Sequence, residues 1–274
     1  MERLFYQREW QGIRLGALDR PSTTGVVGRD FYHSFYQRLL QADPVLTTEW
    51  LEDKRRLAHW LATTWLVARD PQEPLRVLSV GAGLGIVEHE LWMKGYEVNA
   101  LECNEHALRY LAGRCPGLRV MVGDARSLPY QDASFDVVYM ATVDYCFDRA
   151  DYVQVLCEMR RVLRLGGLAL SLCASNLSWP TLLRACTLEM FFRGRKNRQD
   201  TTQVPWGYQR TVGEHLRAGR TADLRCEGVY VFNQHAQVKT VRRAGAWHLA
   251  WPTLRDDMVV VALCRAPRAH AEVA

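Results

Sequence analysis

The chain opens with two stretches whose apolar side chains repeat at helical spacing. Within residues 27–41 the aromatic residues Phe31 and Phe35 lie four positions apart, on one face of a helix. Residues 48–69 carry a second pattern of this kind and end before an Asp-Pro pair, which favours a helix end. We therefore expect residues 1–72 to form an N-terminal helical cap ahead of the main domain.

From residue 75 onward the pattern changes to short, continuous apolar runs separated by helical stretches. Runs that are apolar on both faces are typical of parallel strands covered by helices on either side. We expect an open α/β sheet in a main domain of residues 73–274, with a core at 75–176 and insertions at 177–210 and 233–255. The predicted strands are 76–81, 96–102, 118–123, 135–141, 166–175, 224–232 and 257–264.

Composition places the chain among ordinary globular proteins, with 274 residues, 24% of them charged and 48% hydrophobic. It excludes collagen-like, disordered and small disulfide-stapled classes. The eight cysteines are scattered and lack the Cys/His spacing of a zinc site, so we expect no metal centre and a reducing compartment. The start of the chain lacks a signal-peptide pattern, and no run of about 18 apolar residues occurs, which predicts a cytoplasmic protein without a membrane span.

The positive charge and the tryptophans lie mostly outside the predicted core. The formal net charge is +5, but residues 1–180 hold 20 Lys and Arg against 22 Asp and Glu, whereas residues 181–274 hold 15 against 8. Of the nine tryptophans only Trp92 lies in the core. The excess charge is therefore local, and it does not by itself indicate a nucleic-acid partner.

Three strand ends in the core carry residues suited to a nucleotide-type ligand. The first strand runs into the turn Gly81-Ala82-Gly83-Leu84-Gly85. Glycine lets a chain reverse tightly and approach a ligand closely, and the helix that follows supplies free N–H groups. The second strand ends in Glu102, whose carboxylate can accept both hydroxyls of a ribose, and the third ends in Gly123-Asp124-Ala125. Because ligands bind at the carboxyl ends of parallel strands, these residues predict one site.

The glycine spacing separates this turn from two common nucleotide-binding motifs. Dinucleotide folds use G-x-G-x-x-G and P-loops need Gly-Lys followed by Ser or Thr, whereas this chain has G-x-G-x-G and no such Gly-Lys. Over residues 75–176 the chain resembles the class I S-adenosylmethionine-dependent methyltransferases. The resemblance rests on VLSVGAGLG, NALE, VGDARSLPY, FDVVYMA and MRRVLRLGGLALSL. It implies a Rossmann-like α/β fold, with a mostly parallel seven-stranded sheet whose last strand is antiparallel.

The resemblance also implies where the family's cofactor, S-adenosylmethionine, binds. The glycines hold its methionine part, Glu102 its ribose, and Asp124 with Ala125 its adenine. Ser79 departs from the family, which usually has an acidic residue there to hold the amino end of the cofactor. Either the cofactor binds more weakly, or a carboxylate elsewhere compensates. The implied cofactor-binding residues are Ser79, Gly81, Ala82, Gly83, Gly85, Glu102, Asp124 and Ala125.

Asp144 and Tyr145 are the predicted catalytic residues, because they directly follow the strand FDVVYMAT. In the family that this chain resembles, loops at this position form the mouth of the active site. Methyl transfer needs an aligned acceptor and the exclusion of water, and a general base matters mainly for a hydroxyl acceptor. The alternative for Asp144 is an N-cap of the helix that follows.

Aromatic residues of the flanking segments are the candidates for a substrate site. The predicted substrate-binding residues are Tyr32, Tyr36, Trp206 and Tyr208, with Trp179, Trp247 and Trp251 in the same group. Their alternative role is to pack against the sheet. A basic stretch is either a solvated loop or a clamp for a phosphate or carboxylate of the substrate. It holds Arg193, Arg195, Lys196 and Arg198.

These features together predict an enzyme that methylates an oxygen or nitrogen of a small-molecule acceptor, with S-adenosylmethionine as the methyl donor (EC 2.1.1.-). The acceptor is expected to be aromatic or to carry an anionic group. A tRNA or other nucleic-acid methyltransferase is an alternative, against which the modest charge argues, as does the absence of an N/D-P-P-Y/F tetrad at residues 141–145. A non-catalytic binding or partner protein with the same fold is another, which Ser79 favours and the intact glycine turn opposes.

Overall fold

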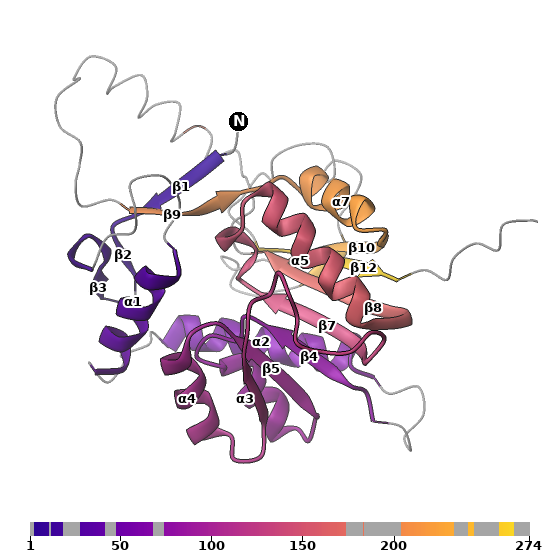
Figure 1. The fold of residues 1–274 in the computed structure, drawn as a ribbon, viewed down its shortest axis with the longest axis horizontal. Coiled ribbons are helices and arrows are strands. Elements are labelled where there is room, and N and C mark those ends of the chain that lie inside the picture. The colour runs from indigo at the N-terminus through magenta and orange to yellow at the C-terminus, as the bar shows by residue number, and fades with distance from the viewer. Residues whose placement is uncertain are drawn as a thin grey trace, which may run out of the picture.

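The fold is an open α/β sheet with a smaller layer of short strands and a helix beside it (Figure 1). The computed structural model describes residues 3–10, 12–18, 28–41, 48–67, 74–173, 183, 204–232, 241–243 and 258–265. Within these residues, no helix has both the length and the apolar composition needed to cross a membrane.

Eight strands form the main sheet, in the order β11-β10-β12-β8-β7-β4-β5-β6. Strands β8, β7, β4, β5 and β6 are parallel, and β12 runs antiparallel to its neighbours β8 and β10. This confirms the seven predicted strands and the antiparallel last one, and the short β11 adds a strand at the edge. The bounds are β4 Val77–Val80, β5 Val98–Glu102, β6 Arg119–Val122, β7 Phe135–Ala141, β8 Leu163–Cys173, β10 Arg225–Phe232, β11 Val241–Arg243 and β12 Met258–Cys264.

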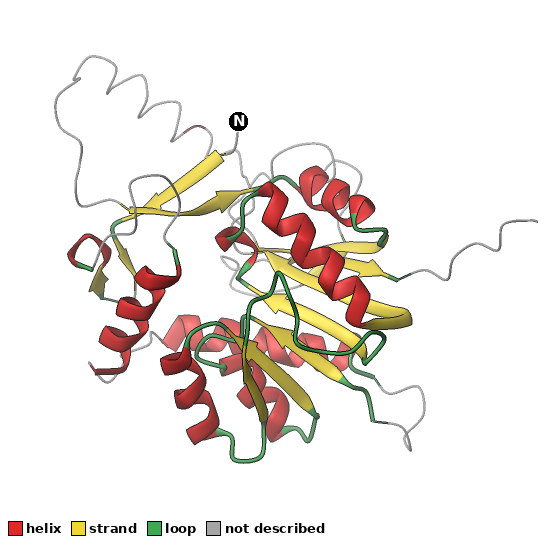
Figure 2. Cartoon of the chain, in the orientation of Figure 1, coloured by secondary structure: helices red, strands yellow, loops and turns green. Residues whose placement is uncertain are grey.

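Helices cover both faces of this sheet (Figure 2). On one face lie α2 (Thr48–Thr64), α3 (Ile86–Met93) and α4 (Glu105–Arg114), and on the other α5 (Arg149–Val162) and α7 (Val212–Thr221). Alternate strand residues divide between the two cores, as the two-residue period of a strand requires. Val77 and Tyr139 pack toward α2 and α3, whereas Leu78 and Val138 pack toward α5.

A separate layer, which we call the roof, combines the start of the chain with a segment about two hundred residues later. Strand β1 (Arg3–Gln7) pairs antiparallel with β9 (Val204–Gln209), and β2 (Glu9–Trp10) pairs with β3 (Ile13–Arg14). The 3-10 helix η1 (Leu15–Ala17) and helix α1 (Arg29–Gln41) complete it. The two helices predicted for the N-terminal region, α1 and α2, are present, but the apolar pattern does not predict β1, β2 and β3.

An apolar cluster joins the roof to the glycine turn of the main domain. The cluster consists of Ile13, Leu15, Leu18, Phe31, Phe35, Leu39, Leu84, Ile86, Val204 and Trp206. The roof also contacts α4, where His33 and His106 bring their Nε2 atoms to 3.3 Å. The roof is therefore packed directly against the carboxyl ends of the parallel strands.

Several sequence predictions lie outside the described residues. They concern the basic stretch with Arg193, Arg195, Lys196 and Arg198, and the tryptophans Trp179, Trp247 and Trp251. The domain limits proposed from the sequence stay predictions.

Candidate cofactor and acceptor site

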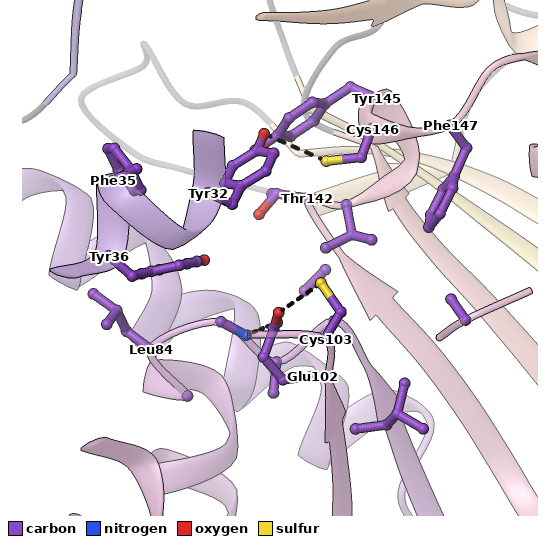
Figure 3. Close-up of a pocket in the computed structure, with 18 of the residues that line it drawn as sticks. Tyr32, Phe35, Tyr36, Leu84, Glu102, Cys103, Thr142, Tyr145, Cys146 and Phe147 are labelled. Carbon is purple, nitrogen blue, oxygen red and sulfur yellow. Dashed lines mark hydrogen bonds between the residues drawn. The ribbon is translucent and has the colours of Figure 1, made fainter. Parts of the chain in front are cut away.

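A cavity of about 620 Å³ lies where the roof meets the carboxyl ends of β4, β5, β6 and β7 (Figure 3). Its lining comes from the glycine turn, the loops after the next three strands, helices α1 and α2, and β9. The close-up shows the Tyr36 side chain pointing into the cavity, with Tyr32 and Tyr145 on one side and Glu102 and Cys103 on the other.

The glycine turn holds three residues in the left-handed region, Gly81, Gly83 and Gly85, with φ of 73°, 55° and 67°. Side chains rarely adopt this conformation, so glycine is required for the shape of the turn. At Gly83 an added Cβ would lie 2.9 Å from the Tyr36 hydroxyl. The missing side chain thus leaves a cradle in the cavity where a ligand can contact the backbone.

Glu102 lies at the end of β5, with 5% of its surface exposed. Its Oε2 accepts a hydrogen bond from the backbone N–H of Gly83 at 2.8 Å, and its Oε1 accepts one from the N–H of Asn104 at 3.0 Å. Asn104 in turn caps α4 through its side chain. These bonds hold the carboxylate between the glycine turn and the cavity, in a position suited to two ribose hydroxyls.

Asp124 and Ala125 line the cavity after β6, and Asp124 is held by Arg126, a residue that sequence reasoning missed. Arg126 donates from Nη2 to Asp124 Oδ2 at 2.7 Å, and from Nη1 to Asp151 Oδ2 at 3.0 Å. The hydrogen bond to Asp124 is the main cause that raises the pKa of Arg126. Arg126 lines the cavity and fixes this loop to α5, with about half of its side chain exposed.

Beneath the glycine turn lies a set of polar residues that we call the polar floor: Ser79, Glu88, Tyr139, Lys54 and Thr142. Ser79 Oγ and Tyr139 Oη both donate to Glu88 Oε1, at 2.6 and 2.8 Å. Lys54 Nζ donates to Thr142 Oγ1 at 2.9 Å. Of this set Glu88, Lys54 and Thr142 line the cavity.

Burial shapes the titration of the two charged residues of the polar floor. It raises the pKa of Glu88, although the hydrogen bonds from Ser79 and Tyr139 and the charge of Lys54 oppose the rise. Burial lowers the pKa of Lys54 to about 8, against the attraction of Glu88 and Asp53. Sequence reasoning missed both residues, because each occupies an ordinary polar position in a helix.

An aromatic wall faces the polar groups across the cavity and contains Tyr32, Tyr36, Tyr145 and Trp206. The Tyr145 and Trp206 rings are stacked, with centroids 6.4 Å apart, and the Tyr32 hydroxyl lies 3.4 Å from Cys146 Sγ. Burial is the main cause that raises the pKa of Tyr32, Tyr36 and Tyr145, and it raises the pKa of Cys146 to about 12. These hydroxyl and thiol groups are therefore protonated at neutral pH.

Three predicted site residues do not line the cavity: Ser79, which belongs to the polar floor, Tyr208 and Asp144. Tyr208 lies two positions beyond Trp206 on β9, about 7 Å along a strand, and it borders a smaller cleft with Arg149 and Arg217. Asp144 is buried on the far side of its loop, with Oδ2 4.0 Å from Nε2 of His215.

The position of Asp144 follows from the 3-10 helix η2 (Asp144–Cys146). A 3-10 helix has three residues per turn, so its consecutive side chains point in different directions. Tyr145 therefore faces the cavity and Asp144 the interior. The N-cap of α5 is Asp148, whose side chain accepts from the N–H of Asp151 at 2.8 Å, so Asp144 does not cap that helix.

Comparisons with known proteins now bear on this site. A family model for a methyltransferase domain matches residues 77–167, from β4 into β8. The chain is 33% identical over 124 residues to a probable phthiotriol/phenolphthiotriol dimycocerosates methyltransferase of Mycobacterium ulcerans, covering 42% of this chain and 46% of that protein. It is 30% identical over 159 residues to a malonyl-[acyl-carrier protein] O-methyltransferase of Methylococcus capsulatus, covering 56% and 54%.

Residues 77–167 match this methyltransferase domain, and the chain is similar to class I S-adenosylmethionine-dependent methyltransferases. The chain spans about half the length of the curated relatives it matches. Its fold is similar to that of the magnesium protoporphyrin IX methyltransferase of Synechocystis solved with bound S-adenosylhomocysteine, with a TM-score of 0.56 and 14% identity over 87% of this chain and 97% of that one. S-adenosylmethionine is the cofactor of the class I family, and the Gly83 cradle, Glu102 and Asp124 of this chain fit it.

Proposed function

We propose that the protein transfers the methyl group of S-adenosylmethionine to an oxygen or nitrogen of a small-molecule acceptor, as an enzyme of class EC 2.1.1.-. The observation that carries this proposal is that the glycine turn, Glu102 and Asp124 share one cavity with the aromatic wall. A cofactor held by the former and a flat or apolar acceptor held by the latter would meet inside a single space.

The chain's own residues bind and orient the cofactor and the acceptor, and they exclude water from the cavity. Bound S-adenosylmethionine supplies an electrophilic methyl group, and displacement at that carbon requires the acceptor atom to lie in line with the bond that breaks. The roof covers the cavity and Trp206, 4% exposed, helps to close it. Tyr32 and Tyr145 can orient the acceptor through their hydroxyls, but neither is a base at neutral pH. This favours acceptors whose reacting atom has an available lone pair without deprotonation by a general base, such as a carboxylate or a neutral amine.

The aromatic wall supports an aromatic or apolar acceptor, and an anionic group on it stays a prediction, since the basic stretch at residues 193–198 lies outside the described residues. Oxygen as the acceptor atom is supported by the Methylococcus relative, whose name gives an O-methyltransferase acting on malonyl-[acyl-carrier protein]. We place the reaction in the cytoplasm, because the structure shows no disulfide among the cysteines it describes.

The proposal is tested by calorimetry with S-adenosylhomocysteine on the wild type, Glu102→Gln and Glu97→Gln. Glu102→Gln removes the charge that would bind the ribose, so its affinity falls by about tenfold or more, since a charge-assisted hydrogen bond contributes ~1.5–3 kcal/mol. Glu97 is an exposed residue just before the same strand, and Glu97→Gln leaves the affinity unchanged.

Thermal unfolding with ligand and the transfer of a labelled methyl group distinguish the alternatives. A wild type that S-adenosylhomocysteine does not stabilise against heating contradicts the proposal, because ligand at a hundred times its Kd would stabilise the fold by about 2.7 kcal/mol. A binding protein would take the ligand yet transfer no labelled methyl group to any extract of small molecules. A nucleic-acid methyltransferase would label tRNA or DNA instead.

A further inference from the structure

Glu88 is a buried carboxylate that faces the cavity. It is not among the residues expected to bind the ribose or to take part in catalysis. It lies in the first turn of α3, is 2% exposed and lines the cavity directly below the glycine turn. Placing a carboxylate there is costly unless a positive or hydrogen-bonding partner offsets the lost hydration. We therefore expect the Glu88 carboxylate to have a function at this position.

The hydrogen bonds of Glu88 leave part of the carboxylate for a ligand. Ser79 and Tyr139 both donate to Oε1, so neither of these two hydrogen bonds occupies Oε2. A carboxylate oxygen accepts up to two hydrogen bonds, so Oε2 can receive donors from a cationic group in the cavity. Ser79 and Tyr139 fix the rotamer of Glu88 and thereby hold Oε2 in place.

Lys54 provides the opposite charge on another element. It comes from α2, is 9% exposed, lines the same cavity and attracts Glu88 electrostatically. Its Nζ is held by Thr142 at 2.9 Å, and Thr142 has a φ of 60°, an uncommon value for a residue other than glycine. Such backbone outliers gather at functional sites, where the surrounding structure stabilises them.

We propose that Glu88 and Lys54 form a site for the zwitterionic amino-acid end of the cofactor, in which Glu88 binds the α-ammonium group and Lys54 the α-carboxylate. The site rests on the proposed function and adds the residues that recognise one end of the donor. A ligand carrying both charges brings a complementary charge to each of the two buried groups at once. Glu88 also supplies the carboxylate that is missing at position 79, because it accepts the hydrogen bond of Ser79.

The test compares two ligands that differ in this end alone. S-adenosylhomocysteine carries the amino acid, and 5′-methylthioadenosine keeps the adenine, ribose and sulfur but ends in a methyl group. Affinities are measured by calorimetry on the wild type, Glu88→Gln, Lys54→Met and Glu90→Gln. Glu90 is a matched control on the same helix, where it pairs with Arg55 at 3.3 Å and does not line the cavity.

Glu88→Gln and Lys54→Met each lower the affinity for S-adenosylhomocysteine by about tenfold or more, as expected for loss of a charged partner. Both variants leave the affinity for methylthioadenosine unchanged. Glu90→Gln changes neither affinity. Adding Ser79→Asp to Glu88→Gln returns a carboxylate to the residue whose side chain contacts Glu88, and recovers most of the affinity for S-adenosylhomocysteine.

Other outcomes overturn the inference. If Glu88→Gln lowers the affinity for both ligands equally, Glu88 only supports the fold of the cavity. If it lowers neither affinity, the amino-acid end binds elsewhere. The side-chain amide in Glu88→Gln still accepts from Ser79 and Tyr139, and the methylthioadenosine affinity reports whether the cavity is intact. A wild type that binds neither ligand overturns the proposed function as well, whereas a wild type that binds both, with variants unchanged, overturns this inference alone.

Discussion

Gly85 carries two separate constraints, one on its backbone and one on its surroundings. Its φ is 67°, and an added Cβ would lie 2.2 Å from Cδ1 of Leu111 on α4. Gly95 offers a matched comparison, because its φ is 83° but nothing lies within 4 Å of its Cβ position. The two glycines therefore separate backbone strain from steric overlap.

We expect Gly95→Ala to destabilise the protein by ~1–2 kcal/mol, the cost of the left-handed conformation. Gly85→Ala adds overpacking against Leu111, so its total loss is about 2–5 kcal/mol. Urea unfolding followed by circular dichroism measures both. Equal losses in the two variants would mean that Leu111 moves aside without cost.

The residue scale also shows where sequence reasoning reaches its limit. Glycines at a strand-to-helix turn and acids at strand ends are local patterns. Glu102 and Asp124, which these patterns single out, both line the cavity, and their binding roles stay predictions. Glu88 and Lys54 carry no such pattern, because only the packing of α2 against α3 turns them inward. A compensating carboxylate is a hypothesis that Ser79 raises from the sequence, and the hydrogen bond between Ser79 and Glu88 supplies a candidate for it.

At the scale of elements, the loop after β6 depends on α5 for its shape. Arg161 on α5 donates to the backbone oxygens of Leu128 and Tyr130, each at 2.8 Å. Glu158, one turn earlier, accepts from the N–H of Leu128 at 2.7 Å and also binds Arg161. Asp124 lies near the start of this loop, so α5 positions the side of the cavity at which we expect the adenine.

Arg161→Met is expected to destabilise the protein by about 2–4 kcal/mol, because it removes the donor to the Tyr130 carbonyl, one of two donors to the Leu128 carbonyl and the charged partner of Glu158. The neighbouring Arg160 binds Asp223, whose side chain is 79% exposed, so Arg160→Met costs about 1 kcal/mol or less. Unfolding in urea gives the two energies, and hydrogen exchange at residues 126–134 locates the effect. Comparable losses for both variants would argue against a special role of Arg161.

The elements themselves divide into those that sequence reasoning found and those it missed. Continuous apolar runs predicted the strands of the main sheet because these strands are covered on both faces. Strand β9 contains Pro205 and Gly207, which ordinarily indicate a loop. Proline is tolerated here because β9 pairs with β1 alone in a two-stranded sheet, and no local pattern signals a partner that lies about two hundred residues away.

At the scale of the whole molecule, one buried histidine links global stability to pH. His215 on α7 is fully buried, and its Nδ1 lies 2.9 Å from the hydroxyl of Tyr152 on α5. Burial, with the nearby charge of Arg210, lowers the pKa of His215 from 6.5 to about 3. Between these values the unfolded chain binds a proton at His215 that the folded protein does not, so stability falls as the pH drops through this window.

His215→Gln removes this contribution and is expected to flatten the dependence of unfolding free energy on pH by about 1.4 kcal/mol per unit across the middle of the window. The measurement is a set of urea titrations between pH 6.5 and the onset of acid unfolding, in which the slope, not the absolute stability, is compared. His59→Gln serves as control, because His59 is exposed on α2. An unchanged slope in His215→Gln would contradict the conclusion that His215 links stability to pH.

The packing of the roof on the glycine turn has a consequence for the design of new specificities. Leu84 and Ile86 belong to the turn and to α3, yet they share one cluster with Phe31, Phe35 and Trp206 of the roof. The proposed acceptor pocket is thus not a module that can be exchanged while the proposed cofactor pocket stays the same. Directed evolution toward a larger acceptor has to vary positions 84 and 86 together with the aromatic wall, and affinity for the methyl donor will change along with acceptor range.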